Sequence, residues 1–143
     1  MLTDYSRIVV AYDHSELSKK ALNMALNLAK QDKQIQLNVV MVLQPTKPLP
    51  YAYGFVSFDD HQREELNTVR KEIEQDLTSL PNKTRTFLLE GNPGQMIVEF
   101  VKQNNADFVV MGSRGLSGLK ELFLGSVSHY VVQKAPCPVL IVK

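Results

Sequence analysis

Short apolar segments alternate with amphipathic segments along this chain. Five segments have the length of a strand and are rich in Val, Leu, Ile or Phe: residues 7–12, 36–43, 83–89, 108–111 and 139–142. Apolar runs of this length are typical of strands buried on both faces, as in a parallel sheet. The pattern therefore predicts five strands.

The segments between these strands repeat apolar residues every three or four positions. This period predicts amphipathic helices over residues 16–30, 58–80, 126–134 and a stretch that begins at residue 92. The tetrapeptide Asn92-Pro93-Gly94-Gln95 suits a helix start, because Asn is a good N-cap, Pro fits the first helical position and Gln can complete a capping box. The Pro81-Asn82 pair is expected to end the second helix.

One segment, residues 44–57, fits neither period. It holds Pro45, Pro48 and Pro50 and then several aromatic residues, so we expect a long loop. Its aromatic side chains suit a lid or a partner surface, and equally a loop that packs on the surface of the protein.

Strands that alternate with helices imply parallel β-α-β units with right-handed crossovers. The fold class is therefore α/β, with an open parallel sheet of five strands. The 143 residues match one domain in length, and the sequence shows no internal repeat or linker, so residues 1–143 are expected to form a single domain.

Charge and composition remove several classes of protein. The chain has 16 Lys and Arg against 15 Asp and Glu, so its net charge is +1. This value lacks the excess of positive charge that is typical of proteins that bind nucleic acid. Cys137 is the single cysteine, so no disulfide can form within the chain. No apolar run approaches the ~20 residues that span a bilayer, and the first residues do not resemble a signal peptide. We expect a cytoplasmic protein that binds neither nucleic acid nor membrane.

Ligands of open parallel sheets bind beyond the carboxyl ends of the strands, at the point where the strand order reverses. The most informative segment in such a position is Gly112-Ser113-Arg114-Gly115, which is followed nine residues later by Gly125-Ser126. Glycines let a ligand approach the backbone, and a helix that begins at Ser126 offers free N–H groups to a phosphate. The hydroxyls of Ser126 and Ser128 can add donors, and Arg114 and Lys120 can neutralise charge.

The same residues also fit a plain turn from strand to helix, in which Ser126 is only the N-cap. None of the known phosphate-loop or nucleophile-elbow patterns is present. Ser126 and His129 are near each other in sequence, but two residues three apart on a helix are more often neighbours than a catalytic pair. The three histidines and one cysteine lack the spacing of a metal site. We therefore assign no catalytic or metal-binding residue.

The spaced glycines, Gly112-x2-Gly115-x9-Gly125-Ser126, resemble the nucleotide-binding signature of the universal stress protein (UspA) family. The first strand, which ends in Asp13, and the final Pro-Cys-Pro-Val-Leu-Ile-Val-Lys are similar to the same family, so the resemblance covers nearly the whole chain. It implies a Rossmann-like sheet in the order 3-2-1-4-5 with helices on both faces, related to the adenine nucleotide alpha hydrolases. It also implies homodimers and ATP, with Mg²⁺ held mainly by the phosphates.

The resemblance implies a role for individual residues. Asp13 would accept hydrogen bonds from ribose or adenine, although it also suits an N-cap in a capping box with Glu16. Val42 would meet adenine through its backbone, although it also suits the core. The base site would include Ala11 and Tyr12, and Met111 would also belong to the nucleotide-binding residues. Ribose and phosphates would be wrapped by Gly112, Ser113, Arg114, Gly115, Gly125, Ser126, Val127 and Ser128.

The last strand predicts a dimer interface. Val139, Leu140, Ile141 and Val142 form a flat apolar edge that invites pairing with a second chain, unless a helix covers it.

Three functions fit the sequence. The first is an ATP-binding stress-response or signalling module that acts as a homodimer. The second is a slow or partner-dependent ATPase or adenylyl-transfer enzyme, although no general base is evident for activating water. The third is a dimeric interaction protein that binds no nucleotide.

Overall fold

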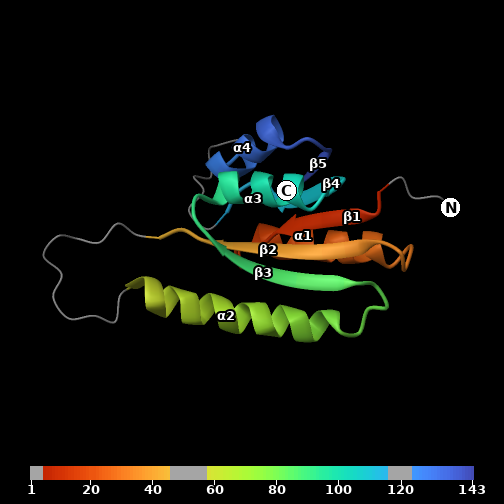
Figure 1. Ribbon diagram of the computed structural model, residues 1–143, viewed down its shortest axis with the longest axis horizontal. Coiled ribbons are helices and arrows are strands. Elements are labelled where there is room, and N and C mark those ends of the chain that lie inside the picture. Colours follow the sequence, from red (N-terminus) through yellow and green to blue (C-terminus); the bar gives the residue numbers. More distant parts are fainter. Residues whose placement is uncertain (1–4, 46–57, 116–123) are drawn as a thin grey trace, which may run out of the picture.

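Five parallel strands form one sheet in the computed structural model, which describes residues 5–45, 58–115 and 124–143. The strands are β1 (Arg7–Ala11), β2 (Gln36–Leu43), β3 (Thr84–Glu90), β4 (Phe108–Gly112) and β5 (Val139–Val142). The helices are α1 (Glu16–Ala29), α2 (Phe58–Leu77), α3 (Pro93–Gln103) and α4 (Ser126–Lys134). The strand order is β3-β2-β1-β4-β5, which confirms the predicted fold class (Figure 1).

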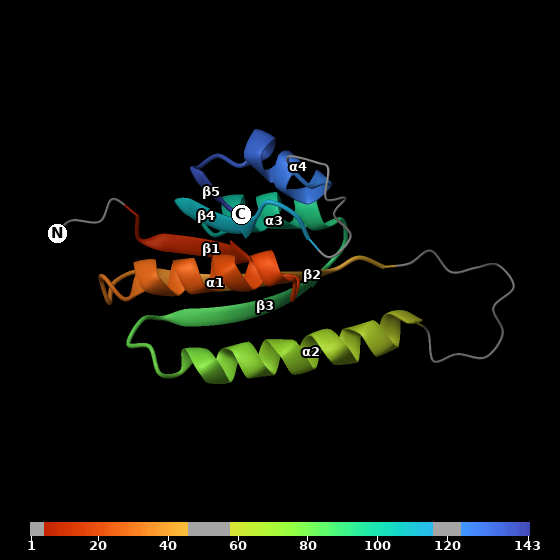
Figure 2. The ribbon, with the colours of Figure 1, turned by 180° about the vertical axis from the view of Figure 1, so that it is seen from behind.

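Successive residues of each strand enter different cores, because side chains alternate across a sheet. In β1, Ile8 and Val10 pack with α1 and α2, whereas Val9 and Ala11 pack with α3 and α4. Figure 1 shows α3 on the near side of the sheet, and Figure 2 shows α1 on the opposite side. The continuous apolar runs of the sequence therefore reflect two buried faces.

Most predicted boundaries agree with the structure, and β2 and β5 agree to the residue. The strand β1 ends one residue early, but Tyr12 still donates its N–H to the carbonyl of Val40 at 3.0 Å. The helix α2 ends at Leu77 instead of Leu80. Of the predicted loop 44–57, only the first two residues are described, and they belong to no helix or strand. The residues proposed as a lid lie outside the described part.

The side chain of Asn82, a few residues after α2, forms buried hydrogen bonds to a distant part of the chain. It is 6% exposed, and its Nδ2 donates to the carbonyls of Ala29, Asp32 and Ile35, each at 2.9 Å. These carbonyls belong to the end of α1 and the turn that leads to β2. Asn82 therefore joins the segment before β3 to the segment before β2, a role that is distinct from ending a helix.

The start of β1 is joined to the start of β4 by a carboxylate. Asp107 accepts hydrogen bonds from the backbone N–H of Ser6 at 3.0 Å and of Arg7 at 3.1 Å. This contact aligns the two central strands, whose carboxyl ends then meet at the same edge of the sheet. None of the helices in the described ranges is long and apolar enough to cross a membrane.

Candidate functional site

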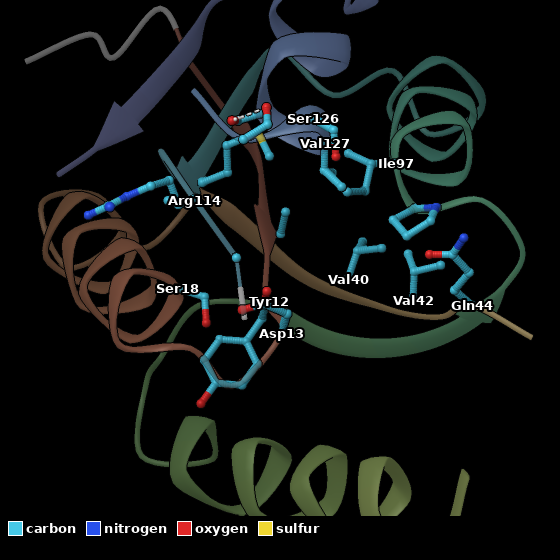
Figure 3. A pocket seen from close by; sticks show the side chains of 17 residues that line it. Tyr12, Asp13, Ser18, Val40, Val42, Gln44, Ile97, Arg114, Ser126 and Val127 are labelled. Atoms are coloured by element: carbon cyan, nitrogen blue, oxygen red, sulfur yellow. Dashed lines mark hydrogen bonds between the residues drawn. The ribbon is translucent and has the colours of Figure 1, made fainter. Parts of the chain in front are cut away.

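A cavity of about 360 Å³ lies beyond the carboxyl ends of β1, β2 and β4, beside the start of α4 (Figure 3). Its position agrees with the switch point of the sheet, where β1 lies between β2 and β4. Its size suits a small-molecule ligand. The residues that line it are Ala11, Tyr12, Asp13, Ser18, Val40, Val42, Gln44, Pro93, Ile97, Met111, Gly112, Arg114, Gly115, Gly125, Ser126, Val127 and Ser128.

Twelve of the thirteen site residues predicted from the sequence line this cavity, and Ser113 does not. The structure therefore brings together residues from three strand ends and one helix start, while their binding role stays a prediction. Sequence reasoning missed five lining residues, namely Ser18, Val40, Gln44, Pro93 and Ile97. The period of two in β2 could have found Val40 and Gln44, because they lie on the same face as Val42.

Asp13 does not cap α1, so that alternative is wrong. The N-cap is Ser15, whose hydroxyl accepts from the N–H of Ser18 at 3.2 Å. Asp13 accepts from the N–H of Ser15 at 3.0 Å, which tightens the turn before the helix. The residue between them, His14, has a backbone φ of 67°, a conformation that residues other than glycine rarely adopt. The tight turn fixes the Asp13 carboxylate beside the cavity.

The glycine that ends β4 and the glycine in the loop after it are needed for different reasons. A Cβ on Gly112 would lie 2.8 Å from the Cβ of Leu17, so this glycine lets α1 pack against the end of β4. A Cβ on Gly115 would overlap a carboxylate oxygen of Asp13. Gly115 therefore keeps open the space between the loop after β4 and the Asp13 carboxylate, both of which border the cavity.

The first turn of α4 faces the cavity without a side-chain cap. Gly125 is the N-cap, and Ser126 is the first helical residue, so the predicted alternative of Ser126 as the N-cap is wrong. The backbone N–H groups of Ser126, Val127 and Ser128 have no acceptor among the described residues. Unpaired N–H groups at a helix start, together with the helix dipole, favour an anion.

Ser113 and Ser128 hold this helix start in place. The carbonyl of Ser113 accepts from the N–H of Gly125 at 2.7 Å and from the hydroxyl of Ser128 at 2.8 Å. The Ser128 hydroxyl is also 3.0 Å from the carbonyl of Gly125, and the residue is 2% exposed. Its single proton is directed at backbone carbonyls, so the predicted donation by Ser128 to a phosphate is not supported. Ser128 instead positions α4.

The cavity has an apolar end and a charged end. Val40, Val42 and Ile97 stand at one end, and Arg114 stands at the other (Figure 3). The ring of Tyr12 points toward α2 and belongs to the core between α1 and α2. Burial and the nearby carboxylate of Asp13 raise the pKa of its phenol. The phenol of Tyr12 is therefore neutral at ordinary pH, and the residue both lines the cavity and packs in the core.

The described residues contain no group of three His, Cys, Asp or Glu side chains that could hold a metal ion. Burial raises the pKa of the Cys137 thiol, which packs in the core beside α3 and α4. This packing is typical of a cysteine that behaves as a small apolar residue.

An open parallel sheet with helices on both faces and a cavity at its switch point defines the doubly wound α/β class of folds. The sequence profile described as "Universal stress protein family" matches residues 4–143. The chain belongs to the universal stress protein family.

Relatives of known name support the same family. The chain is 36% identical to universal stress protein YxiE of Bacillus subtilis over 97% of this chain and 99% of that protein. It is 35% identical to a universal stress protein of Methanocaldococcus jannaschii over 97% of this chain and 82% of that protein. The structure of the universal stress protein UspA from Lactobacillus plantarum superposes with a TM-score of 0.77, at 26% identity, over 99% of this chain and all of that one.

Two more distant structures share the fold and hold nucleotides. A universal stress protein in complex with cAMP superposes with a TM-score of 0.71 at 22% identity, and the two chains are covered to 99% and 98%. A universal stress protein family protein from Arabidopsis thaliana with AMP bound superposes with a TM-score of 0.67 at 20% identity, over 96% of this chain and 91% of that one.

Proposed function

We propose that this chain is an ATP-binding universal stress protein that acts as a homodimeric, nucleotide-dependent module of stress response or signalling. The observation that carries the proposal is the cavity at the switch point, which joins an apolar end to a helix start whose first N–H groups have no acceptor among the described residues. A nucleotide also combines an apolar part, the base, with an anionic part, the phosphate. The cAMP and AMP complexes of the same fold support the ligand class.

Different residues of the cavity would contact the base, the ribose and the phosphate. Val40, Val42 and Ile97 would contact the base, since these side chains form the apolar end of the cavity. Asp13 would accept hydrogen bonds from ribose hydroxyls, because a carboxylate accepts and repels phosphate. The N–H groups at the start of α4, which have no acceptor in the part of the chain that the structure describes, would hold phosphate, and Arg114 would add positive charge to the cavity. Mg²⁺ would accompany ATP and be held mainly by the phosphates.

The net charge of +1 is no obstacle to binding a polyanion. The attraction is local, because a helix start gathers N–H groups and the positive end of the helix dipole at one point. The position of those groups therefore decides phosphate affinity, and the net charge of the protein does not.

We expect purified protein to bind ATP with measurable heat in the presence of Mg²⁺. The first measurement is to denature the protein and identify any small molecule that is released. Titration calorimetry with ATP, AMP and GTP then gives the affinity and the preference for the base. If no nucleotide is released and none gives heat, the proposed function is wrong. Phosphate release measured over hours distinguishes a binding module from an ATPase.

The dimer is proposed to form through β5, the last strand of the sheet. The N–H of Val109 donates to the carbonyl of Pro138 and that of Ser113 to the carbonyl of Val142. Alternate residues of β5 therefore bond to β4, and the N–H of Ile141 points to the open edge. Val139, Leu140 and Ile141 are half-buried in the single chain, so a second copy would complete their burial.

Replacing Ile141 by proline should convert the dimer to a monomer. Proline removes the outward N–H and is tolerated in edge strands, so the pairing of β5 with β4 is kept. Sedimentation at micromolar concentration should show a dimer for the wild type and a monomer for Ile141→Pro. Met24→Ala, which changes an exposed side chain on α1, is the control and should stay dimeric. A wild-type protein that sediments only as a monomer contradicts the proposed dimer.

A further inference from the structure

A second cavity, of about 210 Å³, adjoins the first between the starts of α3 and α4; we refer to it as the annex. Four residues line both cavities, namely Gln44, Pro93, Ser126 and Val127. Figure 3 shows that Gln44 and Val127 stand on the side of the first cavity away from Arg114. The two cavities are therefore neighbouring chambers with a shared wall.

The shared wall includes the phosphate-binding part of the proposed nucleotide site. Ser126 and Val127 offer two of the unpaired N–H groups of α4, and both residues line the annex as well. The inference that follows rests on the proposed function. If a phosphate lies at these N–H groups, a group attached to that phosphate has the annex beside it.

The side chains that complete the annex are polar and neutral. Asn92 uses its Oδ1 to accept from the N–H of Gln95 at 3.2 Å, and its amide NH₂ has no acceptor within the part of the chain that the structure describes. Within the same part, the hydroxyl of Tyr130 and the amide of Gln44 form no hydrogen bond. Amides and hydroxyls both donate and accept, which matches the hydroxyl groups of a sugar.

The same chemistry disfavours further phosphates in the annex. Its described lining contains no cationic side chain, so a phosphate seated in the annex itself would lose water without gaining a counter-charge. A sugar exchanges its hydrogen bonds with water for hydrogen bonds with Asn92, Tyr130 and Gln44. The neutral lining therefore favours a hydroxyl-rich group over an anionic one.

The ring of Tyr130 is a fixed wall of the annex. A Cβ on Gly94 would lie 2.8 Å from Cδ1 of Tyr130, so the glycine lets the ring pack closely on the first turn of α3. Tyr130 is half-buried and belongs to the core beside α3 and α4. The hydroxyl is therefore presented from a ring that has little room to move.

We propose that the annex binds a sugar carried by the phosphate of an adenine nucleotide. The ligand class is a nucleoside diphosphate joined to a sugar, with the nucleoside in the first cavity and the sugar in the annex. ADP-ribose is a probe of this class, and ADP is the matching ligand without the sugar.

Titration calorimetry on the wild-type protein with ADP, ATP and ADP-ribose tests the proposal. Two or so added hydrogen bonds should make ADP-ribose bind about tenfold more tightly than ADP. Equal affinity for ADP and ADP-ribose overturns the proposal. Tighter binding of ATP without tighter binding of ADP-ribose also overturns it, because the annex would then take phosphate. If ADP itself fails to bind, the proposed function is wrong and this inference is wrong with it.

Two conservative variants test whether the tighter binding of ADP-ribose relative to ADP depends on residues of the annex. Tyr130→Phe removes only a hydroxyl, and Asn92→Ser removes the amide NH₂ but keeps an N-cap for α3. Each should weaken ADP-ribose binding about threefold to tenfold and leave ADP binding unchanged. Tyr5→Phe is the control, since Tyr5 is exposed near the opposite end of β1 and should change neither affinity. If Tyr130→Phe and Asn92→Ser both spare ADP-ribose binding, or weaken ADP equally, the assignment is wrong.

Discussion

Replacing Gly115 by valine is expected to weaken ATP binding by about a hundredfold, the equivalent of one charge-assisted hydrogen bond. A side chain at this position would overlap the Asp13 carboxylate, so the carboxylate or the loop after β4 must move. Either movement closes the space between them and separates the ribose acceptor from the phosphate donors of α4. Gly115 is exposed, so the change should cost little in folding free energy.

Calorimetry gives the affinity of Gly115→Val, and thermal unfolding gives its stability. A double-mutant cycle with Gly115→Ala and Asp13→Ala tests the cause, because removing the carboxylate removes the steric overlap. The cost of Gly115→Ala should therefore be smaller in the Asp13→Ala protein. Unchanged ATP affinity of Gly115→Val would show that the loop after β4 does not border the phosphate.

Replacing Asn82 by alanine is expected to reduce the free energy of unfolding by about 3 kcal/mol. The change removes one donor group from the carbonyls of Ala29, Asp32 and Ile35, and the hydrogen bonds to Ala29 and Ile35 are buried while that to Asp32 is partly buried. Buried carbonyls that lose a donor keep the cost of their desolvation. Asn82→Asp should cost more, because it turns a carboxylate oxygen toward three carbonyl oxygens.

Urea unfolding followed by circular dichroism measures both variants. Asn104→Ala is the matched control, because Asn104 is exposed and donates from Nδ2 to a single carbonyl, that of Phe100, at 2.9 Å. Its loss should be below about 1 kcal/mol. If Asn82→Ala costs no more than the control, the contact is replaced by other groups in the variant.

The fold could be predicted from the sequence because its signals are local. Apolar runs defined five strands, and an Asn-Pro pair defined the start of α3, where Asn92 indeed accepts from the N–H of Gln95. The prediction of the strand order had another source, namely the family resemblance that the spaced glycines carry. Periodicity alone did not specify which strand lies beside which, because pairing joins residues that are distant in the sequence.

The candidate site was predicted in outline, and its errors have physical causes. Asp13 and Ser15 are both good capping residues, and only the path of the turn through His14 decides that Ser15 is the N-cap. Ser128 was assigned to phosphate because its hydroxyl is near the helix start. Its burial against the carbonyl of Ser113 is a tertiary contact, and no sequence pattern reports it.

The contact between Asp107 and the start of β1 has a consequence for the folding rate. It joins Arg7 to a residue 100 positions later, and β1 pairs with β4 over a similar distance. Contacts of such long sequence separation form slowly, because closing the intervening chain costs entropy before the contact is gained. When the ribosome has made β1 and β2, the central strand still lacks its other neighbour. We therefore expect the apolar edge of β1 to stay open during synthesis until β4 emerges, which is the interval in which aggregation or a chaperone would act on this chain.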